Sequence, residues 1–136
     1  MTEDNISADQ AKTGWLIDLN WYAEHSRSVS ALLRDCLCDD CRKKVSKEGN
    51  PASEAELISR IRECCQQRAG FITAQMPVME SLFRLFIARG NKPMTVAEMG
   101  RRLSERRGGD LYRTSEEVLL HLLKNDRYYG FRPAAA

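Results

Sequence analysis

Thiol groups are the side chains of this sequence that are best placed to do chemistry. Cys38 and Cys41 form a Cys-x-x-Cys pair, Cys36 precedes this pair, and Cys64 and Cys65 follow as adjacent residues. Two residues between thiols allow a turn to direct both sulfurs at one ion, which makes such a pair a standard half-site for zinc. The sequence therefore predicts a metal site, most simply zinc, with the ligands Cys38, Cys41, Cys64 and Cys65.

Two other interpretations of the thiols stay open at this point. Cys36, Cys64 and Cys65 fall on the apolar stripes of expected helices, where an unliganded cysteine packs as a small hydrophobe. A Cys-x-x-Cys pair also occurs in iron–sulfur proteins and in redox-active dithiols. Within the zinc interpretation, Cys36 or His25 could replace one of the four ligands. Four thiolates fill a tetrahedral ion, so the site would be structural rather than catalytic.

The sequence lacks the signatures of common catalytic sites. It contains no Gly-rich phosphate loop, no Gly-x-Ser-x-Gly turn and no His-Glu-x-x-His motif. The acidic pairs Asp39–Asp40 and Glu116–Glu117 are adjacent residues, so on a helix their side chains point about 100° apart and do not converge as an acid–base pair. We therefore expect a binding protein and not an enzyme.

Charge is distributed unevenly, although the formal net charge is only +2. Residues 1–65 hold nine Lys and Arg against twelve Asp and Glu, whereas residues 66–136 hold twelve against seven. The basic half could face a polyanion such as nucleic acid, and the alternative is a protein partner. The cations assigned to a nucleic-acid contact are Arg101, Arg102, Arg106, Arg107, Arg113 and Lys124.

The bulk composition is that of a soluble globular protein, with 43% hydrophobic and 29% charged residues in a chain of 136. No stretch approaches the roughly 18–20 apolar residues of a membrane span. The first five residues are acidic and polar, unlike a signal peptide. An odd number of cysteines argues against a closed disulfide framework. We expect a cytoplasmic protein with no membrane partner.

The N-terminal half predicts a cysteine-bearing helical region over residues 14–70. Residues 1–13 are polar and without periodicity, so we expect a disordered tail. The apolar run at 15–22 is too short to distinguish a strand from the start of a helix. Ser28 can cap a helix that reaches the first cysteine. Ser53, with a Glu three residues later, forms a capping box before the helix that carries the adjacent cysteine pair.

The C-terminal half, residues 77–133, predicts three helices and a strand. The first helix begins at Pro77 and stops at Gly90-Asn91. The second covers Thr95–Arg107 and the third covers Thr114–Asn125, and each begins with a Thr that has a Glu three residues later, as in a capping box. The composition of residues 128–132 is strand-like.

The apolar spacing and turn residues of this half also carry a resemblance. They are Leu82–Gly90, Pro93-Met94-Thr95, Glu98-Met99, Tyr112-Arg113-Thr114-Ser115, Val118–Leu123, Asn125-Asp126 and Gly130-Phe131. This pattern resembles the HARE-HTH winged-helix family, which occurs in bacterial transcription-associated and restriction-associated proteins and in chromatin proteins. The resemblance covers the C-terminal part only. It implies a winged-helix fold and a role at nucleic acid or the transcription machinery.

Together these features predict a mainly α-helical protein, with a three-helix winged-helix-like module at 77–133 that follows an N-terminal helical, cysteine-bearing extension. The leading functional hypothesis is a small zinc-binding winged-helix regulator that contacts nucleic acid or the transcription machinery. A protein-interaction adaptor is the alternative, and an iron–sulfur or redox protein is the third hypothesis. Glu116 and Glu117 lie in the first turn of the third helix, where they suit the helix dipole but repel DNA.

Overall fold

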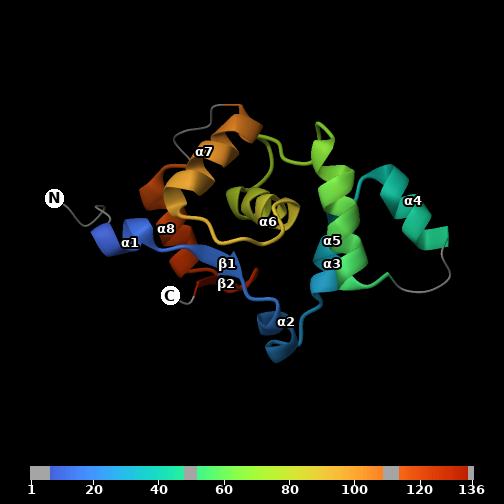
Figure 1. The fold of residues 1–136 in the computed structure, drawn as a ribbon, viewed down its shortest axis with the longest axis horizontal. Coiled ribbons are helices and arrows are strands. Elements are labelled where there is room, and N and C mark those ends of the chain that lie inside the picture. Colours follow the sequence, from blue (N-terminus) through green and yellow to red (C-terminus); the bar gives the residue numbers. More distant parts are fainter. Residues whose placement is uncertain (1–6, 48–51, 109–113, 135–136) are drawn as a thin grey trace.

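A computed structural model describes residues 7–47, 52–108 and 114–134. These residues are mainly helical, as the sequence predicted, and include a small sheet (Figure 1). The elements are α1 (Ala8–Lys12), β1 (Trp15–Ile17), α2 (Asn20–Glu24), α3 (Val29–Asp35), α4 (Asp39–Lys47), α5 (Glu54–Glu63), the 3-10 turn η1 (Cys65–Gln67), α6 (Val78–Ala88), α7 (Val96–Arg107), α8 (Glu116–Lys124) and β2 (Phe131–Pro133). Within the described ranges, no helix has both the length and the apolar character needed to cross a membrane.

The sheet joins an early segment of the chain to a late one. β1 and β2 run antiparallel, with Trp15 opposite Pro133 and Ile17 opposite Phe131. On its other side, Trp15 exchanges two backbone hydrogen bonds with Met94, at 2.8 and 3.0 Å. β1 therefore lies between β2 and the segment that leads into α7, beside the three helices α6 to α8 (Figure 1).

Asn91 fixes this crossing of the chain. Gly90 and Asn91 both have positive φ angles, 75° and 58°, a conformation that glycine and asparagine adopt most readily. They end α6, which confirms the predicted stop. The amide side chain of Asn91 then accepts the backbone N–H of Ile17 at 2.9 Å and donates to its oxygen at 2.8 Å. Asn91 thus helps to end α6 and holds β1 through two hydrogen bonds.

A single cluster of buried side chains runs through both halves of the described chain. Leu33 of α3, Leu57 of α5 and Phe86 of α6 are all fully enclosed. Because hydrophobic burial is the main favourable term in folding, this continuity couples the halves energetically. The region predicted as 14–70 therefore shares its core with the module predicted as 77–133.

Hydroxyl side chains begin several of the helices. Ser28, Ser53 and Thr95 each accept a hydrogen bond from the backbone N–H three residues later, as predicted. The fourth predicted cap, Thr114, is wrong by one residue. Ser115 occupies the cap of α8, and Thr114 is buried against α7 instead.

The first helix replaces part of the predicted disordered tail. Residues 1–6 of that tail lie outside the described residues. The Ser7 hydroxyl accepts the N–H of Gln10 and the Gln10 side chain accepts the N–H of Ser7, both at 3.1 Å. This reciprocal capping box begins α1, a short helix in a segment where the sequence predicted a disordered tail. None of the residues of α1 is buried.

The apolar run at 15–22 contains both of the elements between which the sequence could not decide. β1 forms first, and α2 follows after Asp18, whose carboxylate accepts the N–H of Asn20 at 3.0 Å. Trp21 and Tyr22 of α2 are buried, and the Tyr22 hydroxyl donates to the backbone oxygen of Tyr129 at 2.6 Å. The run thus anchors the early segment on the late one.

Gly100 sets the approach of α7 to α8, and it supports a first prediction. A Cβ atom at this position would lie 2.6 Å from the backbone oxygen of Thr114, closer than real atoms approach. Glycine to alanine inside a helix normally stabilises by about 0.5–1 kcal/mol. For Gly100→Ala we expect the opposite sign, a loss of about 1–3 kcal/mol, because the helices must separate.

Urea unfolding of Gly100→Ala measures this effect. Gly70→Ala is the matched control, since no heavy atom lies within 4 Å of the Cβ that it would add. We expect the control to leave the free energy of unfolding unchanged or slightly raised. An equal gain in both variants would show that α7 and α8 are further apart than the structure places them.

Candidate metal centre

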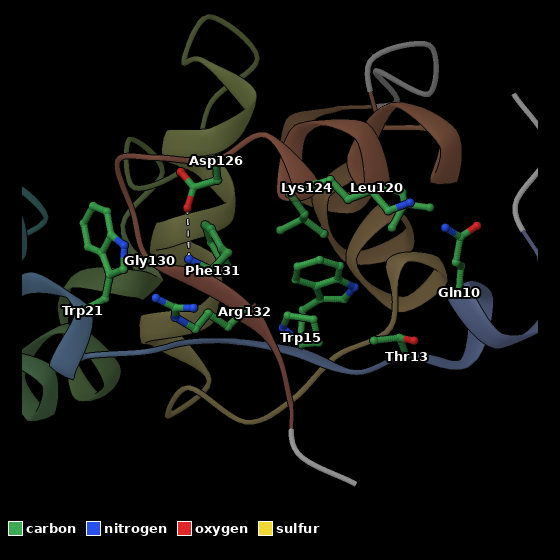
Figure 2. Close-up of a pocket in the computed structure, with 12 residues that line it drawn as sticks. Gln10, Thr13, Trp15, Trp21, Leu120, Lys124, Asp126, Gly130, Phe131 and Arg132 are labelled. Atoms are coloured by element: carbon green, nitrogen blue, oxygen red, sulfur yellow. Dashed lines mark hydrogen bonds between the residues drawn. The ribbon is translucent and has the colours of Figure 1, made fainter. Parts of the chain in front are cut away.

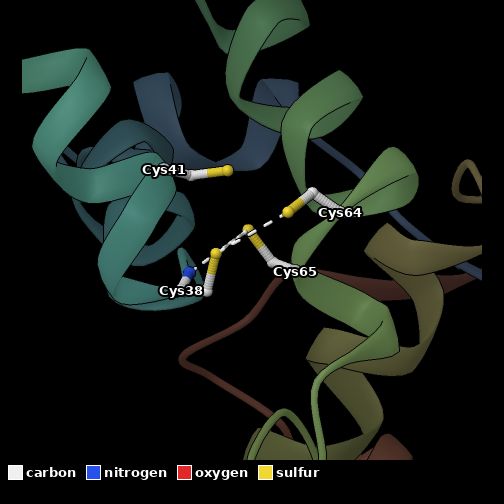
Figure 3. A group of neighbouring side chains, drawn as sticks. All are labelled: Cys38, Cys41, Cys64 and Cys65. Carbon is white, nitrogen blue, oxygen red and sulfur yellow. Dashed lines mark hydrogen bonds between the residues drawn. The ribbon is translucent and has the colours of Figure 1, made fainter.

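Four of the five cysteines converge on one point (Figure 3). Cys38 directly precedes α4, Cys41 lies in its first turn, and Cys64 and Cys65 lie where α5 ends. Their Sγ atoms all lie within 4.8 Å of one another. The Cys38 sulfur is 3.5 Å from that of Cys65 and 3.9 Å from that of Cys64. Zinc–sulfur bonds of about 2.3 Å place the sulfurs of a tetrahedral ion about 3.8 Å apart, so the cluster could hold a metal ion.

The start of α4 positions the first pair of thiols. The helix begins at the residue after Cys38, so Cys38 and Cys41 are three residues apart and face the same side. Asp39 and Asp40 occupy the first turn, where carboxylates are stabilised by the helix dipole. The Cys-x-x-Cys spacing therefore produces convergent sulfurs through an ordinary helix start.

An irregular backbone positions the second pair. On a regular helix, the adjacent side chains of Cys64 and Cys65 would diverge by about 100°. Cys64 instead ends α5 with φ −133° and ψ −64°, and Cys65 begins η1. This break turns both sulfurs toward Cys38 (Figure 3). The sequence predicted both residues on the apolar stripe of one helix. Their sulfurs converge because the helix ends between them.

Donors around the cluster favour negative charge on the sulfurs. The backbone N–H of Cys38 donates to the sulfur of Cys65 at 3.2 Å. The Arg68 guanidinium reaches the Cys64 sulfur at 3.9 Å and pairs with the Asp40 carboxylate at 2.9 Å. Four thiolates around a divalent ion carry two excess negative charges, which a nearby cation partly offsets. Arg68 is placed to do this.

The thiols of the cluster differ in acidity. Desolvation raises the pKa of Cys38, but hydrogen bonds from the Cys41 backbone and from the neighbouring thiols outweigh it and lower that pKa to about 7. Burial raises the pKa of Cys41, and it raises the pKa of Cys65 to about 12. Without metal the Cys38 thiol is therefore more readily ionised than those of Cys41 and Cys65, and a bound cation would have to draw protons from these two.

The two predicted substitute ligands lie elsewhere. Cys36 is buried at the end of α3, where its thiol donates to the backbone oxygen of Leu32 at 3.3 Å, and burial raises its pKa to about 12. His25 is exposed and stacks on Trp21, with 4.2 Å between the ring centroids. Cys36 therefore packs in the core as that interpretation of the thiols predicts, and neither residue belongs to the cluster of four.

This arrangement predicts an order of thiol reactivity. In metal-free protein Cys38 should react first with iodoacetamide, because the thiolate is the nucleophile and its pKa is about 7. Its rate should rise as the pH passes upward through that value. Cys36 should remain unmodified until the chain unfolds. Mass spectrometry of peptides after brief alkylation would show this order, and equal labelling of Cys36 and Cys38 in folded protein would contradict it.

The cations predicted to contact nucleic acid lie in different environments. Arg101 on α7 and Lys124 on α8 are exposed. Arg102 is half-buried and pairs with Glu98 at 3.1 Å. Arg113 lies outside the described residues. The first two are therefore the most accessible cations among the described members of the predicted set.

Arg106 and Arg107 serve the fold. Arg106 donates to the backbone oxygen of Gln66 at 2.7 Å and thereby links α7 to η1. Arg107 is 3% exposed and donates to the hydroxyl of Ser81 at 2.7 Å. Its guanidinium also donates to the backbone oxygens of Thr73, Ala74 and Met76. Enclosed in this way, Arg107 cannot present its guanidinium to a phosphate, contrary to the prediction.

A basic hollow between α6, α7 and η1 adds two residues that were not in the predicted set. It has a volume of about 300 Å³, and its charged lining consists of Arg89, Lys92, Arg102, Glu105 and Arg106. Lys92 is exposed, and Arg89 pairs with Glu98 at 3.4 Å. We call this feature the α6–α7 hollow. Arg89 and Lys92 belong to the basic half of the sequence, but only packing shows that they gather with cations of α7.

Comparison with protein-family models, with curated proteins and with solved structures finds no match to this chain. A function is therefore inferred from the donor atoms of the cysteine cluster and from the charges of the α6–α7 hollow.

Proposed function

We propose that this chain is a small zinc protein in which Cys38, Cys41, Cys64 and Cys65 bind one structural Zn²⁺. The observation that carries the proposal is the gathering of four sulfurs within 4.8 Å of one another. Zinc favours tetrahedral sets of thiolates, and four protein ligands leave no position for a substrate. The role of the metal is then to join the start of α4 to the end of α5.

The compactness of the cluster favours one ion over the alternatives. The cysteines of a multi-iron cluster bind different irons, which spreads their sulfurs further apart than a single ion does. A redox dithiol needs two thiols, whereas here Cys41 and Cys64 accompany Cys38 and Cys65, whose sulfurs are 3.5 Å apart. A mononuclear site uses all four.

Elemental analysis of freshly purified, reduced full-length chain tests the proposal. We expect about one zinc per chain, removed by a strong chelator and restored by added zinc. Cys64→Ser should lose the metal, and Cys36→Ser should keep it, because Cys36 lies outside the cluster. Protein without any bound metal would defeat the proposal. If the protein contains iron and absorbs visible light, the site binds iron and not zinc.

The second part of the proposal is that helices α6 to α8, which we interpret as a winged-helix-like unit beside β1 and β2, contact nucleic acid as a regulator would. The support is the α6–α7 hollow, in which four cations outnumber one carboxylate. Guanidinium and ammonium groups gathered in this way favour phosphate. Glu116 and Glu117 are exposed at the start of α8, so we assign the contact to the hollow together with the exposed Arg101 of α7, and not to that turn.

Charge reversal tests this second part. Lys92→Glu combined with Arg101→Glu should weaken binding of a short mixed-sequence DNA duplex at least about tenfold and reduce the salt dependence of its affinity. Both residues are exposed, so the fold should survive. Fluorescence anisotropy at several salt concentrations gives both quantities.

The matched control for this test is Lys43→Glu combined with Lys44→Glu. These residues are exposed on α4, on the far side of α5 from α7 (Figure 1), and the change in net charge is the same. An equal loss in both double variants would show that overall charge alone attracts DNA. Wild-type protein that binds no DNA even at low salt would favour the adaptor hypothesis.

A further inference from the structure

A cavity of about 510 Å³ lies between α1, α8 and the β1–β2 pair (Figure 2). Small-molecule sites typically have volumes of about 300–1,000 Å³ and are largely apolar, with a few convergent polar groups. Leu120, Leu123 and Phe131 supply apolar walls, and Trp15 and Lys124 supply donors. The cavity shares no lining residue with the cysteine cluster or the α6–α7 hollow, so the proposed function does not account for it.

Trp15 is the unusual residue of this cavity. Its side chain is buried, at 5% exposed, and its indole N–H has no hydrogen-bond partner within the described part of the chain. A buried indole usually finds an acceptor, because an unpaired donor costs about 1–3 kcal/mol. The other unpaired nitrogens, in Arg84 and Arg89, belong to guanidinium groups that donate through their remaining nitrogens. Trp15 has only this one donor.

Lys124 provides a positive charge at the same cavity. Asp126 also lines it, but its carboxylate already accepts three backbone N–H groups from residues 128–131, at 3.0–3.1 Å. Arg132 is paired with Asp18 at 3.1 Å. Among the described residues Lys124 forms no ion pair, and its side chain is exposed. The cavity therefore offers one unpaired cation and one unpaired neutral donor beside an apolar wall.

We propose that this cavity binds a small carboxylic acid with an apolar aryl or alkyl body. One carboxylate oxygen accepts the indole N–H of Trp15, the carboxylate pairs with Lys124, and the body packs on Leu120 and Phe131. A carboxylate satisfies the donor and the cation together, whereas a cationic ligand satisfies neither. Charge-assisted hydrogen bonds of this kind are about twice as strong as neutral ones.

Access to the indole nitrogen requires one side chain to move. The nitrogen is covered, and Figure 2 shows Gln10 and Lys124 on the side of the cavity that it faces. Gln10 belongs to α1, which buries none of its residues. We infer that displacing the Gln10 side chain, which gives up its hydrogen bond to the Ser7 N–H, opens a path to the nitrogen without disturbing the core.

Indole N–H resonances of the full-length ¹⁵N-labelled chain report on this site directly. The chain has two tryptophans, and Trp21→Phe assigns the remaining signal to Trp15. The probes are benzoate, 3-phenylpropionate, 2-naphthoate and octanoate, each compared with its own carboxamide. We expect at least one carboxylate to shift the Trp15 signal saturably, with its amide binding at least about tenfold more weakly. No saturable shift with any of the four acids, or equal binding of acid and amide, would overturn the proposal.

Three variants locate the contacts. Trp15→Phe keeps an aromatic ring at the buried position but removes the donor, and Lys124→Gln removes the charge from an exposed position that does not support the fold. Each should weaken binding of the best acid about tenfold, with the backbone amide of Phe131 as the reporter. Lys12→Gln, an exposed α1 cation that does not line the cavity, should leave affinity unchanged. Unchanged affinity in Lys124→Gln, or an equal loss in Lys12→Gln, would show that the cavity does not recognise a carboxylate.

Discussion

Replacing Cys65 with serine should release the metal and lower the free energy of unfolding by about 4 kcal/mol when free zinc exceeds the dissociation constant a thousandfold. The size follows from linkage, because an ion that binds only the folded chain stabilises it by RT ln(1 + c/Kd), where c is the concentration of free zinc and Kd is the dissociation constant of zinc. Cys65 is 1% exposed, and its sulfur accepts the N–H of Cys38 at 3.2 Å. A hydroxyl at this position is a poor zinc ligand and cannot replace the thiolate.

In Cys65→Ser, the loss of stability should affect the helices around the cluster before it affects the whole fold. α4 lies at the edge of the molecule beside α5, and the cluster joins the start of one helix to the end of the other (Figure 1, Figure 3). Hydrogen exchange should therefore accelerate in α4 and at the end of α5, while amides of α6 to α8 keep their protection. Uniform acceleration over the whole described chain would contradict this expectation.

Two comparisons separate metal loss from poor packing. Wild-type protein treated with a chelator should unfold at the same urea concentration as Cys65→Ser. Cys36→Ser should keep its metal and most of its stability, because its hydroxyl can donate to the Leu32 oxygen as the thiol does. If the chelator leaves wild-type stability unchanged while Cys65→Ser is unstable, then Cys65 contributes through packing alone.

The membership of the cysteine cluster was predictable from sequence, but its geometry was not. Thiol chemistry and the spacing of Cys38 and Cys41 narrow the choice of ligands, because a helix start brings residues three apart onto one side. The convergence of Cys64 and Cys65 depends on the backbone break at Cys64, which the helical periodicity of α5 does not indicate. The sequence pattern therefore identified the donor residues, whereas the irregular end of α5 sets the direction of the Cys64 and Cys65 sulfurs.

In the fold, too, local features were predictable from the sequence and long-range contacts were not. Caps such as Ser28 and Ser53 act within one turn, so the sequence locates the helices they begin. The pairing of Trp15–Ile17 with Phe131–Pro133 joins segments at opposite ends of the sequence, and the alternation of apolar residues in a strand does not specify its partner. Helices that begin with a strong cap, such as α3 and α5, were therefore predictable one by one, whereas α1 and the strand pairing that merges the two predicted regions were not.

The largest single-residue effect outside the metal site should come from Arg107, where Arg107→Lys should lower the free energy of unfolding by about 2–4 kcal/mol although it keeps the charge. The guanidinium donates to the Ser81 hydroxyl and the Met76 oxygen, both at 2.7 Å, and to other backbone oxygens of the segment before α6. A lysine ammonium has three donors on one atom and cannot span these acceptors, so buried oxygens lose their partners.

Arg101→Lys is the matched control, the same exchange at an exposed position of the same helix, and should change the free energy of unfolding by less than about 0.5 kcal/mol. Urea unfolding compares the two variants, and hydrogen exchange should show residues 73–81 loosened only in Arg107→Lys. The neighbouring sequence reads Arg106-Arg107, so nothing local distinguishes a surface cation from a buried one, and the distinction depends on carbonyl groups from residues 73–76. If Arg107→Lys instead matches wild-type stability but loses affinity for DNA, the guanidinium faces a phosphate and the structural role assigned to it is wrong.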